Sequence, residues 1–383
     1  MDYDVAAVRS HFPALNEGAS HFDGPGGSQT PDVVAEAVTS ALTAAIANRG
    51  SITRAEQRAE EIVATARRTM AGFLNAETVV FGRSMTQLTY DFARTLARNW
   101  TAQDEVIVTR LDHDANIRPW VQAAEAVGAT VRWAAFDKDT AELHTKDITD
   151  LLTDRTRLVA VTGASNLLGT KPDIEAITRK AHEANALVYV DGVHLTPHAK
   201  VDVEAMGADF YACSPYKFLG PHLGVLAAKA ETLEQLHPDK LLPSTNEVPE
   251  RFELGTLPYE LLAGTTAAVD FLESLGMDAL EAHENALRDR LEAGLREIPD
   301  IKIYGSPERD RTPTVLFTAE GEEPQEVYRR LAAHNVNAPA SHFYAIEASR
   351  WLGLGDKGGV RAGIAPYTNE SDVDRLLEAL AQR

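Results

Sequence analysis

The sequence predicts an α/β fold in which a mostly parallel sheet forms a large domain and a smaller α+β domain follows it. Short strand-like runs alternate with helical patterns from about residue 31 to residue 221. Several of these runs are apolar almost throughout, which is typical of strands that helices cover on both faces. From about residue 245 the pattern changes to long helical stretches and a mixed section. A chain of 383 residues is also longer than one hydrophobic core usually supports. We therefore expect a large domain at residues 20–250 and a small domain at residues 1–19 and 251–383.

Periodicity and capping signals locate the individual elements. Thr30 followed by Pro31 indicates a helix start, and apolar residues then recur every four positions as far as Ile46. Ser371 is expected to cap a closing helix that runs to Arg383. Further helices are expected at 88–96, 174–185, 261–275 and 280–298. Strands are expected at 79–81, 106–108, 131–133, 158–161, 187–190, 210–213, 301–304 and 314–317.

The composition excludes several classes of partner. A formal net charge of −20 gives an acidic surface that repels nucleic acid and anionic lipid. The single cysteine, Cys213, forms neither an intrachain disulfide nor a cysteine-based zinc site. The first residues do not resemble a signal peptide, and no apolar run is long enough to span a bilayer. We expect a cytoplasmic protein that binds neither membranes nor nucleic acid.

Polar residues gather directly after five of the expected strands. In open α/β sheets, ligands bind outside the carboxyl ends of the strands. Because these ends lie at one edge of a parallel sheet, we expect the polar residues to line one pocket. The clusters are residues 82–87 (GRSMTQ), 112–116 (DHDAN), 165–166 (SN), 191–194 (DGVH) and 214–217 (SPYK).

Four features of these clusters match the chemical needs of pyridoxal 5′-phosphate. The cofactor's aldehyde needs a lysine amine, which Lys217 offers. Its pyridine nitrogen needs a carboxylate, which Asp191 offers. Its phosphate needs a helix N-terminus with hydroxyl donors, and the turn at 84–87 supplies one. Its ring needs a flat group above or below, and His113 is the candidate.

These residues resemble a known family, the class V aminotransferase or cysteine desulfurase-like branch of fold-type I pyridoxal phosphate enzymes. The resemblance covers nearly the whole chain, and its most specific stretch runs from Asp191 to Gly224. Other matching segments occur in the family's order. They are HFDGPGGSQTP (21–31), LDHDANIRPW (111–120), ASNLLGT (164–170), RFELGT (251–256) and VRAGIAPYTNESDVDRLLEAL (360–380).

The resemblance implies catalytic and substrate-binding roles. Lys217 would hold the cofactor as a Schiff base and later move the substrate's α-proton. Asp191 would pair with the ring nitrogen, and His113 would stack on the ring. Arg361 would clamp the substrate's α-carboxylate, a task that suits a planar guanidinium.

The resemblance also implies a set of residues around the cofactor's edges and the substrate. Asn166 and His194 would lie near the ring hydroxyl. Thr256 would reach the phosphate of a neighbouring subunit, so the resemblance implies a homodimer with shared active sites. Arg49 lies in a stretch that borders the substrate in relatives. The phosphate would be held by Thr86, Ser214 and Tyr216, the last in place of a usual histidine. Ser84 and Met85, from the turn at 84–87, are also expected to bind the cofactor.

One departure from the family concerns the loop in which desulfurases carry the cysteine that attacks the substrate's sulfur. Where that loop reads roughly His-His-Cys-Ala, this chain reads His342-Phe343-Tyr344-Ala345. Cys213 is expected to be inert packing at the end of a buried strand. We therefore expect chemistry at the α-carbon of a small amino acid without a protein thiol, foremost C–S cleavage by β-elimination, with Tyr344 shaping the pocket. Transamination, epimerisation and oxidative deamination remain open alternatives.

Two hypotheses lie outside this class. A metal hydrolase would use six oxygen and nitrogen ligands, although it would leave Lys217 and Arg361 without roles, and we expect no metal. A non-catalytic relative that acts as a binding partner would have no use for an intact lysine, aspartate and arginine. The six candidate ligands are Asp112, His113, Asp114, Asp191, His194 and His198.

Overall fold

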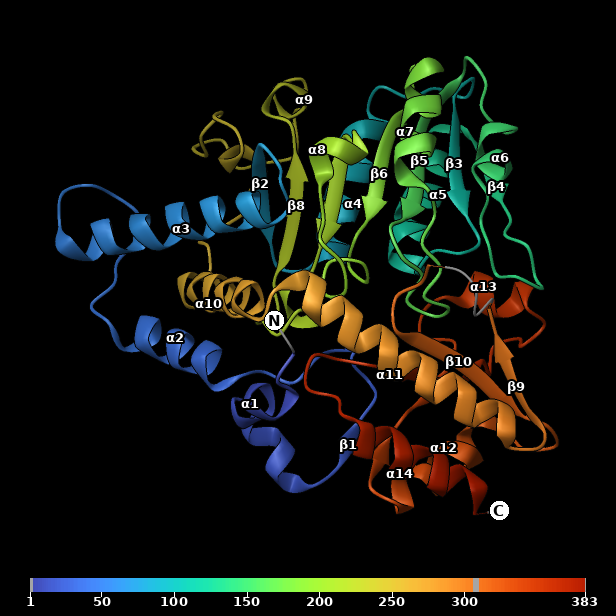
Figure 1. Cartoon of the computed structure of the whole chain (residues 1–383). Coiled ribbons are helices and arrows are strands. Elements are labelled where there is room, and N and C mark those ends of the chain that lie inside the picture. The colour runs from blue at the N-terminus through green and yellow to red at the C-terminus, as the bar shows by residue number, and fades with distance from the viewer. Residues whose placement is uncertain (1–2, 306–309, 383) are drawn as a thin grey trace.

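A computed structural model describes residues 3–305 and 310–382, and its centre is a seven-stranded sheet (Figure 1). Six strands share one direction, whereas β8 is antiparallel to both of its neighbours. The predicted mostly parallel sheet is therefore confirmed. In spatial order the strands are β2 (Thr78–Gly82), β8 (Gly224–Ala228), β7 (Phe210–Cys213), β6 (Leu187–Asp191), β5 (Thr156–Thr162), β3 (Glu105–Thr109) and β4 (Thr130–Ala134).

Strand β8 was not among the predicted strands. Its sequence, Gly-Val-Leu-Ala-Ala, has one β-branched residue, so its strand signal is weak. It forms because it lies between β2 and β7, where all five residues are buried. Tertiary burial here outweighs a weak local preference.

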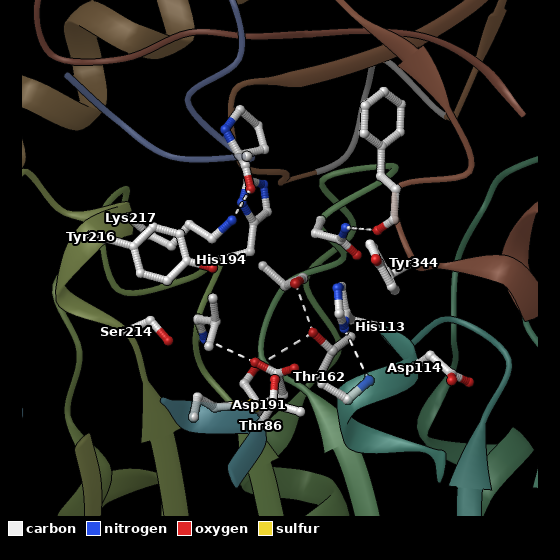
Figure 2. A pocket seen from close by; sticks show the side chains of 18 of the residues that line it. Thr86, His113, Asp114, Thr162, Asp191, His194, Ser214, Tyr216, Lys217 and Tyr344 are labelled. Carbon is white, nitrogen blue, oxygen red and sulfur yellow. Dashed lines mark hydrogen bonds between the residues drawn. The ribbon is translucent and has the colours of Figure 1, made fainter. Parts of the chain in front are cut away.

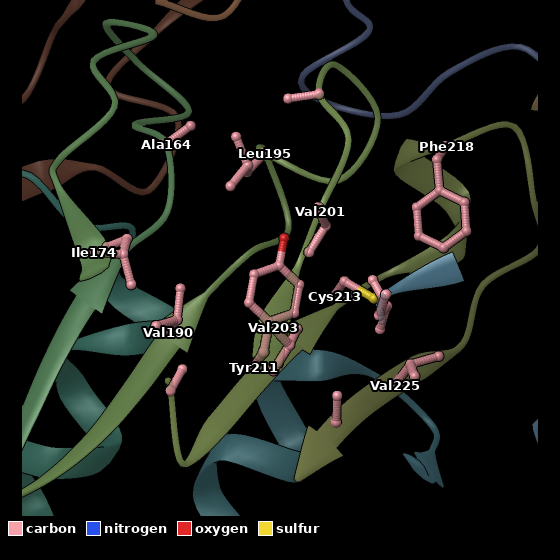
Figure 3. Packing of buried hydrophobic residues seen from close by; sticks show 14 of the residues in the cluster. Ala164, Ile174, Val190, Leu195, Val201, Val203, Tyr211, Cys213, Phe218 and Val225 are labelled. Carbon is pink, nitrogen blue, oxygen red and sulfur yellow. The ribbon is translucent and has the colours of Figure 1, made fainter. Parts of the chain in front are cut away.

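Helices cover both faces of this sheet. Alternate residues of β2 show the division, because Val79 and Phe81 belong to one apolar cluster and Val80 belongs to another. The first cluster includes Cys213 and Tyr211 from β7 (Figure 3). Its covering helices are α3 (Arg54–Phe73), α7 (Ile174–Glu183) and α10 (Tyr259–Leu275). The second face is covered by α4 (Met85–Ala97) and α5 (Arg118–Val127).

A second, four-stranded sheet is antiparallel throughout and has its own apolar cluster. The N-terminal strand β1 (Ser20–His21) joins this part of the molecule by pairing with β11 (Val336–Asn337). The strands of the sheet are β12 (Ala340–Ser341), β13 (Gly359–Gly363), β10 (Thr314–Ala319) and β9 (Ile301–Tyr304). The helices packed on it are α11 (Met277–Glu297), α12 (Pro324–Ala333) and α14 (Glu370–Ala381).

Two predicted helix starts are wrong by one or two residues. Pro31, in an extended conformation, is the N-cap of α2 (Asp32–Thr43), so Thr30 makes no cap. Asn369 caps α14 and forms a capping box with Asp372, so Ser371 lies inside the helix. The predicted end of this helix, Arg383, lies outside the described residues.

Short helices make up the remaining elements. None of the helices in residues 3–305 and 310–382 is both long enough and apolar enough to cross a membrane. The short α-helices are α1 (Val5–Ser10), α6 (Thr145–Thr149), α8 (Val203–Met206), α9 (Ala230–Glu234) and α13 (Ile346–Trp351). The 3-10 helices are η1 (Pro13–Glu17), η2 (Asp114–Asn116), η3 (Pro215–Lys217) and η4 (Glu250–Phe252).

Candidate active site

The carboxyl ends of β3, β5, β6 and β7 open into one cavity of about 620 Å³ (Figure 2). Residues of the small sheet and of the segment after β1 close it from the other side. The structure thus brings together eleven side chains that the sequence singled out. They are Met85, Thr86, His113, Asn166, Asp191, His194, Ser214, Tyr216, Lys217, Tyr344 and Arg361.

Lys217 ends the short helix η3 and points its amine into the cavity (Figure 2). Its Nζ donates a hydrogen bond of 2.5 Å to the carbonyl oxygen of Pro25 and lies 4.7 Å from the ring centre of Tyr216. Burial, followed by the positive charge of Arg361, lowers the pKa of Lys217 to about 7. Near neutral pH, a large fraction of this amine is therefore unprotonated and can act as a nucleophile or a base.

Asp191 is the last residue of β6 and is almost fully buried. One carboxylate oxygen accepts the backbone N–H of Val193 at 3.0 Å. Burial raises the pKa of Asp191 to about 6, against the opposing effects of that hydrogen bond and of Lys217. A buried carboxylate with so little compensation will pair readily with a cationic ring nitrogen.

His113 caps helix η2, and its protonation state follows from that role. Its Nδ1 accepts the backbone N–H of Ala115 at 3.0 Å. Burial, followed by the charge of Lys217, lowers the pKa of His113 to about 4. The ring is therefore neutral at physiological pH, with its proton on Nε2, and one face stacks against Tyr344.

The N-terminus of α4 lies at the cavity wall, and the first N–H groups of a helix are a favourable site for an anion. Met85 and Thr86 line the cavity, and the hydroxyl of buried Ser214 lies nearby. A methyl group on Gly224 would come within 2.3 Å of the Ser84 carbonyl carbon, so only glycine lets β8 approach this turn. Together they form a cradle of the kind that binds phosphate.

Arg361 of β13 is 1% exposed and held on two sides. Its Nη1 donates to the backbone oxygen of Asn166 at 3.0 Å, and its Nη2 donates to the Oδ1 of Asp23 at 3.1 Å. The ring of Phe343 covers the guanidinium, with its centre 3.8 Å from the central carbon. The Nε of Arg361 and the Oδ1 of Asn166 are buried without a partner among the described residues, as expected of groups that await a ligand.

His194 has a partner that the sequence does not reveal. Its Nε2 lies 2.9 Å from the hydroxyl of Thr314 in β10, and its ring meets that of His198 edge-on. His198 in turn contacts the buried carboxylate of Glu284 at 2.8 Å. Burial, followed by the charge of His198, holds the pKa of His194 well below its usual value.

Three residues predicted for the site lie outside this cavity. Arg49 does not line the cavity of its own chain, because Glu60 at 2.8 Å and Glu250 at 3.4 Å hold its guanidinium elsewhere, and its substrate-binding role stays a prediction. Ser84 faces its own helix and accepts the N–H of Gln87 at 3.1 Å. Thr256 is exposed on the surface of the chain.

Several lining residues were not predicted from the sequence. Asp23, Pro25 and Phe343 all lie in quoted motifs, but nothing in their local pattern indicates that they reach Lys217 or Arg361. Arg118 also lines the cavity, where it forms an ion pair of 2.8 Å with Asp114 of the predicted cluster 112–116, and their spacing of four residues near a helix start was a usable signal. Of the residues in the described ranges, no three His, Cys, Asp or Glu side chains are placed to hold a metal ion.

Comparisons with known proteins agree with this geometry. A family model described as aminotransferase class-V matches residues 20–376. The aminotransferase-like protein FGM3 of Gibberella zeae is 34% identical and covers 99% of this chain and 98% of its own. A probable cysteine desulfurase of Staphylococcus epidermidis is 32% identical and covers 99% and 97%. The crystal structure of the cysteine desulfurase CsdA from Escherichia coli has a TM-score of 0.90 at 28% identity, and covers 99% of this chain and 98% of its own.

The fold and the cavity define a pyridoxal phosphate-dependent enzyme of fold type I. The chain belongs to the aminotransferase class-V family, in its cysteine desulfurase-like branch. The residues present fit the cofactor: a reactive amine at Lys217, a buried carboxylate at Asp191 and a phosphate cradle at the start of α4 face one cavity.

Proposed function

We propose that this enzyme cleaves the C–S bond of a small sulfur amino acid by β-elimination, without using a protein thiol. One observation carries the proposal. The loop from Ser341 to Ala345 reaches the cavity with Tyr344, whereas Cys213, the chain's single cysteine, is buried in the core at the end of β7 (Figure 3). Burial raises the pKa of the Cys213 thiol, so it has little thiolate character.

In this proposal the cavity residues divide the work. Arg361 binds the substrate's α-carboxylate, and Asp191 keeps a proton on the ring nitrogen. Bound pyridoxal phosphate supplies an electron sink for the charge that develops at the α-carbon. The unprotonated amine of Lys217 takes the α-proton, for which its lowered pKa of about 7 is well suited.

The elimination step balances without an outside oxidant or reductant. The electron pair of the Cα–H bond forms a double bond between Cα and Cβ, while the pair of the Cβ–S bond leaves with the sulfur. Addition of water then releases pyruvate and ammonia. Asn166, His194 and His113 surround the ring, and Met85, Thr86, Ser214 and Tyr216 hold the phosphate in this proposal.

A homodimer completes the proposal. Thr256 is exposed and does not line the cavity of its own chain, as expected of a residue that serves the phosphate of a neighbouring subunit. Large apolar side chains are exposed on the surface, among them Leu254 at 47%, two residues before Thr256, and Ile52 at 88%. Such side chains favour an interface between chains. We place this dimer in the cytoplasm.

A spectrum combined with product analysis tests the function. The purified protein is expected to be yellow, and Lys217→Ala is expected to lose the band of the bound cofactor. Mixed with cysteine, cystine or cysteine conjugates, the enzyme is expected to release pyruvate and ammonia together. Cys213→Ala is the matched control, since elimination without a protein thiol must survive it.

Two other outcomes would point elsewhere. Release of a keto acid with the aminated cofactor, and without sulfur loss, would make the enzyme a transaminase. Loss of sulfur release in Cys213→Ala, with the fold intact, would refute the thiol-free mechanism.

A further inference from the structure

Asp23 forms an ion pair with one of the two cationic groups of the cavity and belongs to a turn that contacts the other. Its Oδ1 is 3.1 Å from the Nη2 of Arg361, and its negative charge also acts on Lys217, whose protonated form it favours. Two residues later in the same turn, the carbonyl oxygen of Pro25 accepts the Lys217 amine at 2.5 Å. The turn that carries Asp23 therefore touches both Arg361 and Lys217.

Gly26 makes room for this arrangement. A Cβ on Gly26 would lie 2.5 Å from Asp23 Oδ1 and 2.6 Å from Oδ2, so any larger residue would push the carboxylate away. The backbone N–H of Gly26 also donates to the Asp23 carbonyl oxygen at 2.8 Å, which closes the turn. The position of the Asp23 carboxylate thus depends on glycine, which has no side chain, at position 26.

While the Nη2 of Arg361 binds Asp23, its Nε has no hydrogen-bond partner among the described residues. Within residues 3–305 and 310–382, Asp23 is the one carboxylate that forms an ion pair with it. The Nε of Arg361 is buried and has no partner among the described residues. An incoming carboxylate can therefore bind side-on, through Nε and Nη2, by sharing or displacing the bond to Asp23.

We propose that Asp23 binds the substrate's α-ammonium group, and that it serves as the counter-ion of Arg361 when no substrate is present. This inference rests on the proposed function, because it requires an amino-acid substrate. The reason is geometric. The substrate must bring its carboxylate to Arg361 and its amine to the place of the Lys217 amine, and the turn of Asp23 contacts both residues in the same cavity.

The negative charge of Asp23 also determines which chemical class of ligand the site prefers. An α-amino acid brings one positive and one negative charge, which match Asp23 and Arg361. A carboxylic acid without an amine brings only the negative charge, which Asp23 repels. The site should therefore prefer α-amino acids to otherwise identical carboxylic acids.

L-Alanine and propionate form a suitable ligand pair, because they differ only in the amine and neither carries sulfur. Dissociation constants for the holoenzyme would be measured for alanine by the change in the visible spectrum, and for propionate by competition. In Asp23→Asn, we expect propionate to bind more tightly and alanine more weakly, so that the preference for alanine falls at least tenfold. The loss of one hydrogen bond between the Asp23 carboxylate and the α-ammonium group accounts for a tenfold change in relative affinity.

Gly26→Ala is the second variant, in case Asp23→Asn does not fold. It retains the charge but displaces the carboxylate, and we expect the same direction of change. Asp374→Asn is the matched control, because it breaks an exposed pair with Arg290 at 2.8 Å, outside the cavity. It should leave the preference unchanged.

The outcomes separate this inference from the proposed function. A yellow variant at position 23 or 26 that retains the wild-type preference overturns the role of Asp23 and leaves the elimination chemistry intact. A wild-type protein that binds no pyridoxal phosphate refutes the proposed function and this inference with it.

Discussion

The rings of His113 and Tyr344 stack with their centres 5.5 Å apart and their planes inclined by 22°. Two hydrogen bonds to backbone oxygens connect the loop of Tyr344 to segments that follow strands of the large sheet. The backbone carbonyl oxygen of Tyr344 accepts the N–H of Asp114 at 2.8 Å. The backbone carbonyl oxygen of Phe343 accepts the side-chain amide of Asn166 at 3.0 Å. Phe343 and Tyr344 adopt positive φ angles of 51° and 59°, respectively, and these hydrogen bonds stabilise that backbone conformation.

Tyr344→Phe should retain activity within about twofold, because a phenyl ring preserves the stack on His113. Tyr344→Ala should raise KM about three- to tenfold, because it removes the stack, which is worth about 1 kcal/mol. Steady-state kinetics of both variants checks this. A large loss of kcat in Tyr344→Phe would instead assign the hydroxyl an acid–base role.

The rate at which the apoprotein takes up its cofactor should rise with pH through about 7, since burial lowers the pKa of Lys217 to about that value. The sign follows from the chemistry: only the unprotonated amine attacks the aldehyde, and it accumulates as pH rises above its pKa. Arg361→Met should move the profile to higher pH, because the guanidinium is a positive charge that disfavours the protonated lysine. Absorbance after rapid mixing measures both profiles, and a rise confined to pH 10 would contradict this environment for Lys217.

Gly224→Ala should weaken cofactor binding tenfold or more. Its Cβ would come within 2.6 Å of the Met85 nitrogen, so the start of α4 must shift away from the phosphate cradle. Gly72→Ala is the matched control, because a methyl group added to this helical glycine would have nothing within 4 Å of it. Alanine there should stabilise the protein by about 0.5–1 kcal/mol. Titration of the apoproteins with pyridoxal phosphate compares the two, and equal affinities would contradict the cradle.

Cys213→Ala should keep full activity and lower the free energy of unfolding by about 1–2 kcal/mol, because it removes one buried sulfur from the core. Native protein should resist alkylation, since burial raises the pKa of this thiol. Denaturant unfolding and mass spectrometry after treatment with iodoacetamide measure these properties. Rapid modification of the native enzyme would show that the thiol is accessible.

Mixed dimers test whether Thr256 serves the neighbouring subunit. Lys217→Ala chains and Thr256→Ala chains should each be impaired alone. Mixed in equal amounts at limiting cofactor, they should recover about a quarter of wild-type activity, since half of the dimers then contain one complete site. No recovery, in a sample that light scattering shows to be dimeric, would mean that Thr256 acts within its own chain or not at all.

Much of the fold was predictable because its signals are local. The runs before Asp191 and Lys217 are apolar, short and rich in β-branched or aromatic residues, so they indicate buried strands without knowledge of their neighbours. The polar residues that follow them reach one cavity because parallel strands end at the same edge. Strand β8 was not predicted because its small residues form a strand only between two neighbouring strands, β2 and β7.

The sequence by itself determined which strands carry chemistry and that Lys217 and Asp191 belong to one pyridoxal phosphate site. Only the tertiary structure decided that Asp23 pairs with Arg361 across 338 residues of sequence, and that ion pairs hold Arg49 away from the cavity. The physical reason is one of range. Periodicity and strand ends are set by neighbours along the chain, whereas a contact between distant segments exists only after the two sheets have packed together.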